Sequence, residues 1–267
     1  MKPTITIIGA GNVGTYVASG ITEAALALGK VTITRNKSPF SSEEKKRYVC
    51  LRNNKTAITK AKVIIIAVQP KQVDEVISSI KSSLTAGQLI ISVVSGASIE
   101  RIKMLVGRTD VSVVRAMPNV AIAVRRSMTC LAFDGASKEH KKLVEIIFSS
   151  VGKTLVIPEE KFPQATVLVG SGPAFVAKFI RLYMQAAIQA GFNEHEALMM
   201  VEEVVIGTGL LLSTSGSHPE VMIDKVTTPD GCTIAGIAAL EHEGFGAALL
   251  KGIMTAILRA KELYAKK

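Results

Sequence analysis

The sequence is poor in cysteine and in aromatic residues. Its 267 residues include 3 cysteines, no tryptophan and only 4% aromatics. Because Cys50, Cys130 and Cys232 form no CxxC pair, neither a disulfide framework nor a zinc site is predicted, and a reducing cytoplasm is the expected location. The basic residues are scattered without interleaved aromatics, so the chain lacks the features of a nucleic-acid-binding surface.

Leader-like and metal-binding patterns are also missing. The chain runs from Met1-Lys2-Pro3 directly into a strand-like segment, and no apolar run is expected to cross a bilayer, so neither a signal peptide nor a membrane partner is predicted. No metal is expected, because the histidines share no metal-like spacing and are predicted to be solvated. These histidines are His140, His195, His218 and His242.

What the chain has in excess is apolar residues and positive charge. Hydrophobic residues make up 48%, which is high for a soluble monomer and predicts apolar surface buried between subunits. The formal net charge of +10 favours anionic partners, such as a phosphorylated cofactor or a carboxylate substrate.

The first part of the chain alternates short β-branched runs with amphipathic segments. The runs are nearly all apolar, which predicts parallel strands covered on both faces and hence a doubly wound Rossmann sheet of the α/β class. The predicted strands are Thr4 to Ile8, Val31 to Thr34, Val63 to Val68, Leu89 to Val94 and Val111 to Arg115. The predicted intervening helices include Val13 to Leu28 and Val73 to Leu84.

The proline-flanked stretch from Pro158 to Pro163 separates a part with alternating strand and helix patterns from a part with helical patterns, and no convincing strand follows it. We therefore expect a dinucleotide-binding domain over residues 1–160 and an all-helical domain over residues 161–267. Four helices are expected there, over Ala174 to Ala190, Glu194 to Ser213, Thr233 to Leu240 and Gly246 to Ala265. Lys178 and Arg181 are the only charged residues between Gln164 and Gly191, so a partner subunit is expected to cover this helix. The alternative is that the helix is central in its own domain.

A glycine-rich segment follows the first strand and opens a helix. Gly9 to Gly14 reads GAGNVG, the GxGxxG pattern in which glycines make the tight turn, admit a pyrophosphate and allow close helix packing. The N–H groups at the helix start hold the phosphates in such sites. The predicted cofactor contacts here are Gly9, Gly11, Asn12, Val13 and Gly14.

The second strand ends in Thr34-Arg35-Asn36-Lys37-Ser38, where an NAD-preferring site would place a carboxylate. Arg35, Asn36 and Lys37 instead suit a ribose phosphate, so NADPH is predicted, with NADH weaker. A basic solvated turn is the alternative.

Further cofactor contacts are expected where strands end. Val68 and Pro70 follow the strand at Val63, although proline is also a common strand terminator. Asn119 follows the strand at Val111, where a structural role in a turn is the alternative. Asn54 is also predicted to contact the cofactor.

Three segments, together with the GxGxxG segment at Gly9 to Gly14, resemble the pyrroline-5-carboxylate reductase family. Arg115 to Asn119 is similar to its RxMPN segment, Gly170 to Phe175 to GSGPAY, and Thr228 to Gly236 to SPGGTTIAG. The chain departs from the family at Val120-Ala121 in place of Thr-Pro, at Gln69 in place of Lys, and at Asp230 in place of Gly. A carboxylate at position 230 is expected to weaken binding of an anionic substrate unless it points to solvent.

The resemblance implies an NADPH-dependent reduction of the ring imine of 1-pyrroline-5-carboxylate to L-proline, in a homodimer or higher homo-oligomer built by the helical domain. Gly231 and Cys232 begin a helix after a turn, so backbone N–H groups there are expected to cradle the carboxylate. Thr233 is the predicted catalytic residue, with helix capping as the alternative. Gly172 and Pro173 are predicted to face the substrate, and Cys232 is predicted to be a small buried residue.

Two other functions remain open. A β-hydroxyacid dehydrogenase shares the two-domain plan, but its catalytic Lys would fall at Val176, and Lys178 is out of register. A regulator that binds NADPH without turnover is the second alternative, and imine-dependent oxidation would exclude it.

Overall fold

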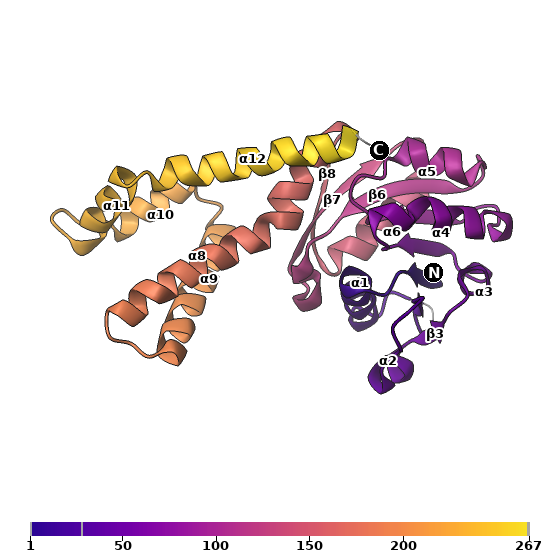
Figure 1. The fold of residues 1–267 in the computed structure, drawn as a ribbon, viewed down its shortest axis with the longest axis horizontal. Coiled ribbons are helices and arrows are strands. Elements are labelled where there is room, and N and C mark those ends of the chain that lie inside the picture. Colours follow the sequence, from indigo (N-terminus) through magenta and orange to yellow (C-terminus); the bar gives the residue numbers. More distant parts are fainter. Residues whose placement is uncertain (1, 28, 266–267) are drawn as a thin grey trace. The chain divides into compact units, whose positions relative to one another are not determined.

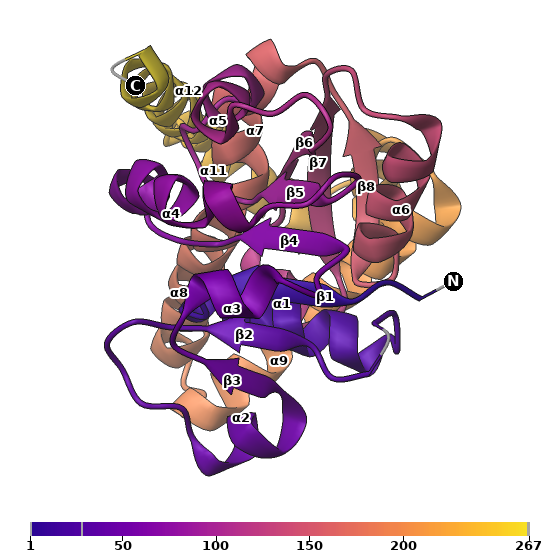
Figure 2. The same cartoon turned by 90° about the vertical axis from the view of Figure 1, so that its right-hand side faces the viewer.

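The computed structural model describes residues 2–27 and 29–265. Among them are eight strands of one sheet, in the order β3-β2-β1-β4-β5-β6-β7-β8 (Figures 1 and 2). The strands are β1 (Ile5–Ile8), β2 (Thr32–Thr34), β3 (Val49–Leu51), β4 (Val63–Ile66), β5 (Leu89–Ser92), β6 (Ser112–Met117), β7 (Ser127–Phe133) and β8 (Gly152–Val156). All neighbouring strands are parallel except β6 and β7.

The sheet is apolar on both faces because the central strands are runs of isoleucine and valine, and β1, β4 and β5 are buried along their whole length. One face is packed against α3 (Asn54–Ile58), α4 (Val73–Ile80), α5 (Ile99–Val106) and α7 (Phe162–Ala165). The other is packed against α1 (Asn12–Glu23) and α6 (Lys138–Ser149). The predicted doubly wound α/β fold is confirmed. The predicted end of the first helix at Leu28 lies outside the described residues.

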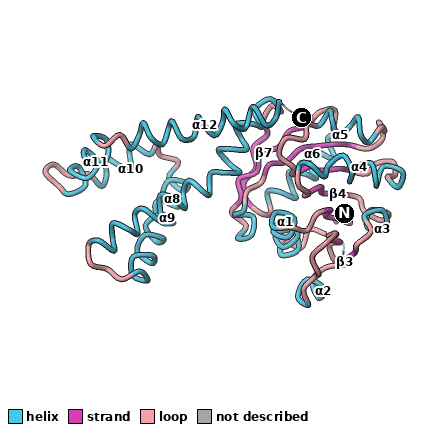
Figure 3. Tube along the Cα trace, in the orientation of Figure 1, coloured by secondary structure: helices cyan, strands magenta, loops and turns pink. Residues whose placement is uncertain are grey.

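Beyond β8 the described chain is helical (Figure 3). It contains α8 (Gly172–Gln189), α9 (Glu194–Ser215), α10 (Pro219–Val226), α11 (Cys232–His242) and α12 (Phe245–Ala265). Helix α10 was not predicted, although His218 accepts from the backbone N–H of Glu220 and Pro219 occupies its first position. The predicted all-helical second part is confirmed.

The chain divides into two compact units. The first comprises residues 1–173 and returns with residues 257–267, and the second comprises residues 174–256. A domain boundary at residues 160–161 follows the change from strands to helices and stays a prediction.

A buried arginine joins distant segments within the first unit. Arg115 in β6 is 2% exposed and its Nη1 donates to Glu159 Oε1 at 3.0 Å. Its guanidinium carbon lies 4.4 Å from the ring centre of Phe162 and 5.0 Å from that of Tyr264. Tyr264 is also joined to Thr166 by a 2.6 Å hydroxyl contact, so the arginine anchors the end of α12 to the sheet.

Arg115→Lys is expected to lower the free energy of unfolding by about 2 kcal/mol, because lysine keeps the charge but loses the planar stacking on two rings. Urea denaturation followed by circular dichroism measures this change. Lys103→Arg, at a half-exposed ion pair with Asp134, is the matched control and should leave the midpoint unchanged. An unchanged midpoint for Arg115→Lys would contradict the anchoring role.

Three expectations about individual segments are wrong. His140 is buried on the apolar face of α6, its Nδ1 lies 2.7 Å from Ser112 Oγ, and burial lowers the pKa of its imidazole. Cys232 is exposed in the single chain rather than buried.

The third wrong expectation is that the chain contains no apolar run long enough to cross a bilayer. The described segments Glu159–Gln189 and Glu194–Ser215 reach the length of a membrane span, with mean hydropathies of 1.3 and 1.5, although length and composition alone are weak evidence for one. Only 11% of the most apolar stretch of each segment is buried, so both segments present apolar surface.

Candidate active site

The turn between β1 and α1 can be built only with glycine at two positions. Gly9 has φ +95°, and a Cβ there would lie 2.7 Å from Ala67 O. A Cβ on Gly14 would lie 2.3 Å from Gly9 O, so the third glycine of the pattern lets α1 pack on the turn. A Cβ on Gly11 would meet nothing within 4 Å, which leaves open space in front of the helix start.

The start of α1 suits an anion. Its N-cap residue, Gly11, has no side chain to cap the helix, and its first turn contains no acidic residue. The first N–H groups of an α-helix have no intrahelical acceptor, so those of Asn12, Val13 and Gly14 can donate to phosphate oxygens.

Beside this turn lies a cavity of about 300 Å³ between the ends of β1, β2 and β4. It brings together seven of the residues predicted to contact the cofactor: Gly9, Gly11, Arg35, Asn36, Lys37, Asn54 and Val68. Asn54 Oδ1 accepts from Thr34 Oγ1 at 2.6 Å, which ties the end of β2 to α3. Gln69 and Gln72 also line the cavity and were not predicted to do so.

Five other predicted residues lie outside this lining. Asn12, Val13 and Gly14 begin α1. Pro70 begins the short 3-10 helix η1 (Pro70–Gln72) and precedes α4. Asn119 is the N-cap of η3 (Val120–Val124), where its Oδ1 accepts from Ala121 N at 3.1 Å. The side chain of Asn119 therefore has the structural role considered as the alternative, and its contact with a cofactor stays a prediction.

Arg35 is held by the protein itself. Its Nε donates to Ala10 O at 2.7 Å, its Nη1 to Pro39 O at 2.9 Å, and its guanidinium forms an ion pair with Glu44. Burial alone would raise the pKa of Glu44, but hydrogen bonds from Arg35 and Ser41 outweigh it and hold that pKa below its usual value. The positive charge of Arg35 is thus compensated before any ligand binds.

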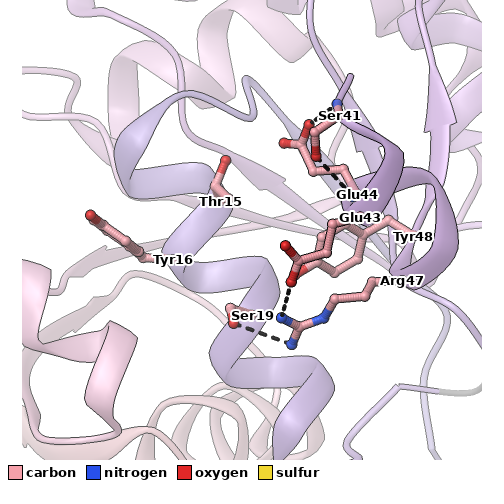
Figure 4. A pocket seen from close by; sticks show the side chains of 8 residues that line it. All are labelled: Thr15, Tyr16, Ser19, Ser41, Glu43, Glu44, Arg47 and Tyr48. Carbon is pink, nitrogen blue, oxygen red and sulfur yellow. Dashed lines mark hydrogen bonds and ion pairs between the residues drawn. The ribbon is translucent and has the colours of Figure 1, made fainter. Parts of the chain in front are cut away.

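A second pocket, of about 430 Å³, lies between α1 and α2 (Ser42–Arg47) (Figure 4). Glu43 and Glu44 line it, and Arg47 is paired there with Glu43 and Glu23. This pocket therefore offers an anionic ligand no uncompensated charge. The described residues contain no group of three or more His, Cys, Asp or Glu side chains that could hold a metal ion.

The predicted substrate cradle is a tight turn in the second unit. Gly231 N donates to Thr228 O at 3.1 Å, with Pro229 and Asp230 between them. Asp230 has φ +59°, so this is a type II turn whose third position favours glycine. A Cβ on Gly231 would lie 2.5 Å from Thr228 Oγ1 and 3.1 Å from Thr228 O, so a larger residue at this position would crowd Thr228.

Helix α11 begins directly after this turn with an uncapped start. Its N-cap, Gly231, has no side chain to accept from the helix N–H groups, and the first turn carries no acidic residue. Thr233, the second residue of α11, is half-buried, and its hydroxyl has no hydrogen-bond partner among the described residues. The capping alternative for Thr233 is therefore excluded, and the hydroxyl is available to a ligand.

Gly172 and Pro173 lie where a π-helical segment, η5 (Thr166–Ser171), passes into α8. The helix was expected from Ala174, whereas α8 begins at Gly172. π-helical turns are rare in proteins, and those that occur are often found at functional sites. Contact of Gly172 and Pro173 with substrate stays a prediction.

Two family descriptions match the chain. "Pyrroline-5-carboxylate reductase dimerisation" matches residues 159–263, and "NADP oxidoreductase coenzyme F420-dependent" matches residues 4–96. The dimerisation match begins close to the end of the sheet at Val156.

Curated relatives and solved structures agree with these matches. Pyrroline-5-carboxylate reductase 1 of Dictyostelium discoideum is 38% identical over 98% of this chain, which spans half of that relative's length. Pyrroline-5-carboxylate reductase 2 of the same organism is 33% identical over 94% of this chain and 89% of its own. The structure of a pyrroline-5-carboxylate reductase from Coxiella burnetii is similar with a TM-score of 0.89 at 28% identity, covering 98% of this chain and 99% of its own.

Proposed function

Because the chain belongs to the pyrroline-5-carboxylate reductase family, we propose that it reduces 1-pyrroline-5-carboxylate to L-proline with NADPH, the last step of proline biosynthesis. The observation that carries the proposal is the uncapped start of α11. There a turn constrained by Gly231 presents free N–H groups beside the unpartnered hydroxyl of Thr233. The N–H groups suit the substrate carboxylate, and the hydroxyl of Thr233 suits the ring nitrogen.

The residues around the turn at Gly9 fit the cofactor. The open space in front of Gly11, the free N–H groups of α1 and the cavity beside β2 suit a dinucleotide with an anionic pyrophosphate. NADPH, when bound, supplies the hydride that the imine carbon accepts. Lys37 is exposed at the end of β2 and suits the ribose phosphate that distinguishes NADPH from NADH.

The chain's own part in the reaction is positioning and proton handling. The N–H groups of Cys232 and Thr233 would bind the substrate carboxylate, and the absence of acidic residues in the first turn of α11 keeps that end of the helix electropositive. The hydroxyl of Thr233 would hydrogen-bond the ring nitrogen, either orienting a protonated imine or relaying the proton that the nitrogen gains. One hydride and one proton together convert the imine to the secondary amine of proline.

The proposal is tested by following NADPH oxidation through its near-ultraviolet absorbance, with and without 1-pyrroline-5-carboxylate and with NADH in parallel. We expect substrate-dependent loss of absorbance that is faster with NADPH. Tight NADPH binding without loss of absorbance would contradict the proposal and favour a non-catalytic NADPH-binding protein.

Replacement of Asp230 tests the carboxylate cradle. Asp230→Asn tolerates the same backbone conformation but removes the negative charge, so the KM for the anionic substrate is expected to fall severalfold while kcat and NADPH affinity stay unchanged. The difference in KM between the variant and the wild type should be smaller at high salt, because salt screens an exposed charge. Asp230→Gly should lower KM equally. An unchanged KM at low ionic strength in both variants would show that Asp230 does not act on the substrate.

We propose in addition that the second unit forms a homodimer or a higher homo-oligomer. None of the described residues of α8, α10 and α11 is buried, and α9 buries only Ala197 and Val201. Apolar side chains exposed on α8 include Val176, Phe179, Leu182 and Tyr183. A second copy of the chain would cover such a surface, in keeping with the dimerisation match over residues 159–263. A cytoplasmic location, without nucleic acid or membrane as partner, belongs to the same proposal.

A further inference from the structure

Two arginines lie at the loop after β2: Arg35 lines the nucleotide cavity, and Arg52 donates to the backbone oxygen of Arg35 from outside the lining. Arg35 was predicted from the sequence as a phosphate ligand. Its side chain is only 17% exposed and is paired with Glu44, whose side chain is 14% exposed. Most of its N–H donors are used by Ala10, Pro39 and Glu44.

Glu44 is fixed in that position by its own helix. It is the third residue of α2, and Ser41 and Glu44 form a capping box in which Ser41 N donates to Glu44 Oε2 at 2.7 Å (Figure 4). To bind a phosphate, Arg35 would have to leave this carboxylate, and the carboxylate would then repel the phosphate. The pair instead holds the backbone of the turn at Ala10 against the loop after β2.

Arg52 differs from Arg35 in its exposure and in its ion pairing. It follows β3, is exposed, and has no ion pair with a carboxylate among the described residues. Its Nη1 donates to Arg35 O at 2.8 Å, which places the guanidinium at the loop that lines the cavity. Its guanidinium carbon lies 4.9 Å from the ring centre of Phe40, and that of Arg35 lies 5.1 Å from the same ring. The aromatic ring therefore helps to order Arg52.

We infer that Arg52 is a ligand of the 2′-phosphate of NADPH and the residue that most strongly favours NADPH over NADH, whereas Arg35 is a positioning residue. Arg52 brings an uncompensated charge and free N–H donors to the loop formed by Asn36 and Lys37. A guanidinium pairs with phosphate through parallel N–H groups, which a neutral side chain cannot replace. Arg35 supports the cavity through its contacts with Ala10 and Glu44.

The inference rests on the proposed function only through its cofactor, so it is tested by binding rather than by turnover. Isothermal titration calorimetry would measure the Kd of NADPH and of NADH for the full chain and for single variants. Arg52→Gln is expected to weaken NADPH binding tenfold or more and to leave NADH binding within about twofold. Lys55→Gln removes one exposed positive charge from α3 but leaves the guanidinium that donates to Arg35 O in place, so it should change neither constant.

Arg35→Gln distinguishes the two roles. If Arg35 positions the turn, its loss weakens NADPH and NADH by similar factors and lowers the melting temperature. A selective loss of NADPH binding in Arg35→Gln, or an unchanged ratio of the two constants in Arg52→Gln, would overturn the inference. Failure of the proposed function would look different, because NADPH would bind with its usual preference while 1-pyrroline-5-carboxylate remained unreduced.

Discussion

Replacing Gly14 with alanine is expected to weaken NADPH binding by at least about 100-fold. The new Cβ would lie 2.3 Å from Gly9 O, which is a backbone atom that cannot rotate away. Either α1 or the turn must shift, and both carry the groups that receive the pyrophosphate. Overpacking of this kind also lowers the free energy of unfolding, by roughly 1–3 kcal/mol. Calorimetry with NADPH and a urea titration measure the two effects.

Gly11→Ala is the matched control for this prediction. A Cβ on Gly11 meets no protein atom within 4 Å, so this variant should unfold at the wild-type urea concentration. It should nevertheless bind NADPH weakly, because the methyl group enters the space in front of the helix start. Wild-type NADPH affinity in both variants would show that the pyrophosphate does not bind at this turn.

Removal of the Thr233 hydroxyl is expected to lower kcat by about 100-fold or more, in the range that general acid–base groups contribute. The hydroxyl has no partner among the described residues and Gly231 is the N-cap, so Thr233→Ala should neither destabilise α11 nor change the Kd of NADPH. Steady-state kinetics with 1-pyrroline-5-carboxylate would give kcat, and calorimetry the Kd.

Two further variants separate the hydroxyl from the shape of the side chain. Thr233→Val preserves the branched shape and should be as slow as Thr233→Ala, whereas Thr233→Ser keeps the hydroxyl and should recover much of the turnover. Full activity in Thr233→Val would assign the proton transfer to another group.

The fold and the cofactor loop were accessible from the sequence because each rests on a local rule. Isoleucine and valine runs indicate strands buried on both faces, and three glycines between a strand and a helix indicate a tight turn. The structure supplies the reason at Gly9 and Gly14, where a Cβ would collide with backbone. Some elements were missed because they are short, such as β3 with 3 residues and α10 with 8, which are too few for a clear periodicity. The strands β7 and β8 were also not predicted.

Roles that depend on contacts between distant segments were harder to predict. The charge of Arg35 could be read from the sequence, but its pairing with Glu44 arises from the fold of α2. The Ser41-x-x-Glu44 pattern was a usable signal for that capping box. His140 was predicted to be solvated together with the other histidines, although it shares a helical face with Val144, Ile147 and Phe148. Arg52 follows the unpredicted strand β3, so nothing in the sequence placed it beside Arg35.

The proposed reaction transfers hydride from NADPH to the imine carbon of 1-pyrroline-5-carboxylate. The most direct test uses NADPH carrying deuterium at the nicotinamide position that releases the hydride, prepared separately for each face, followed by mass spectrometry of the product. We predict that one of the two labelled cofactors yields proline with a single deuterium on the former imine carbon. Absence of deuterated proline with both cofactors, despite NADPH binding, would contradict the assigned reaction.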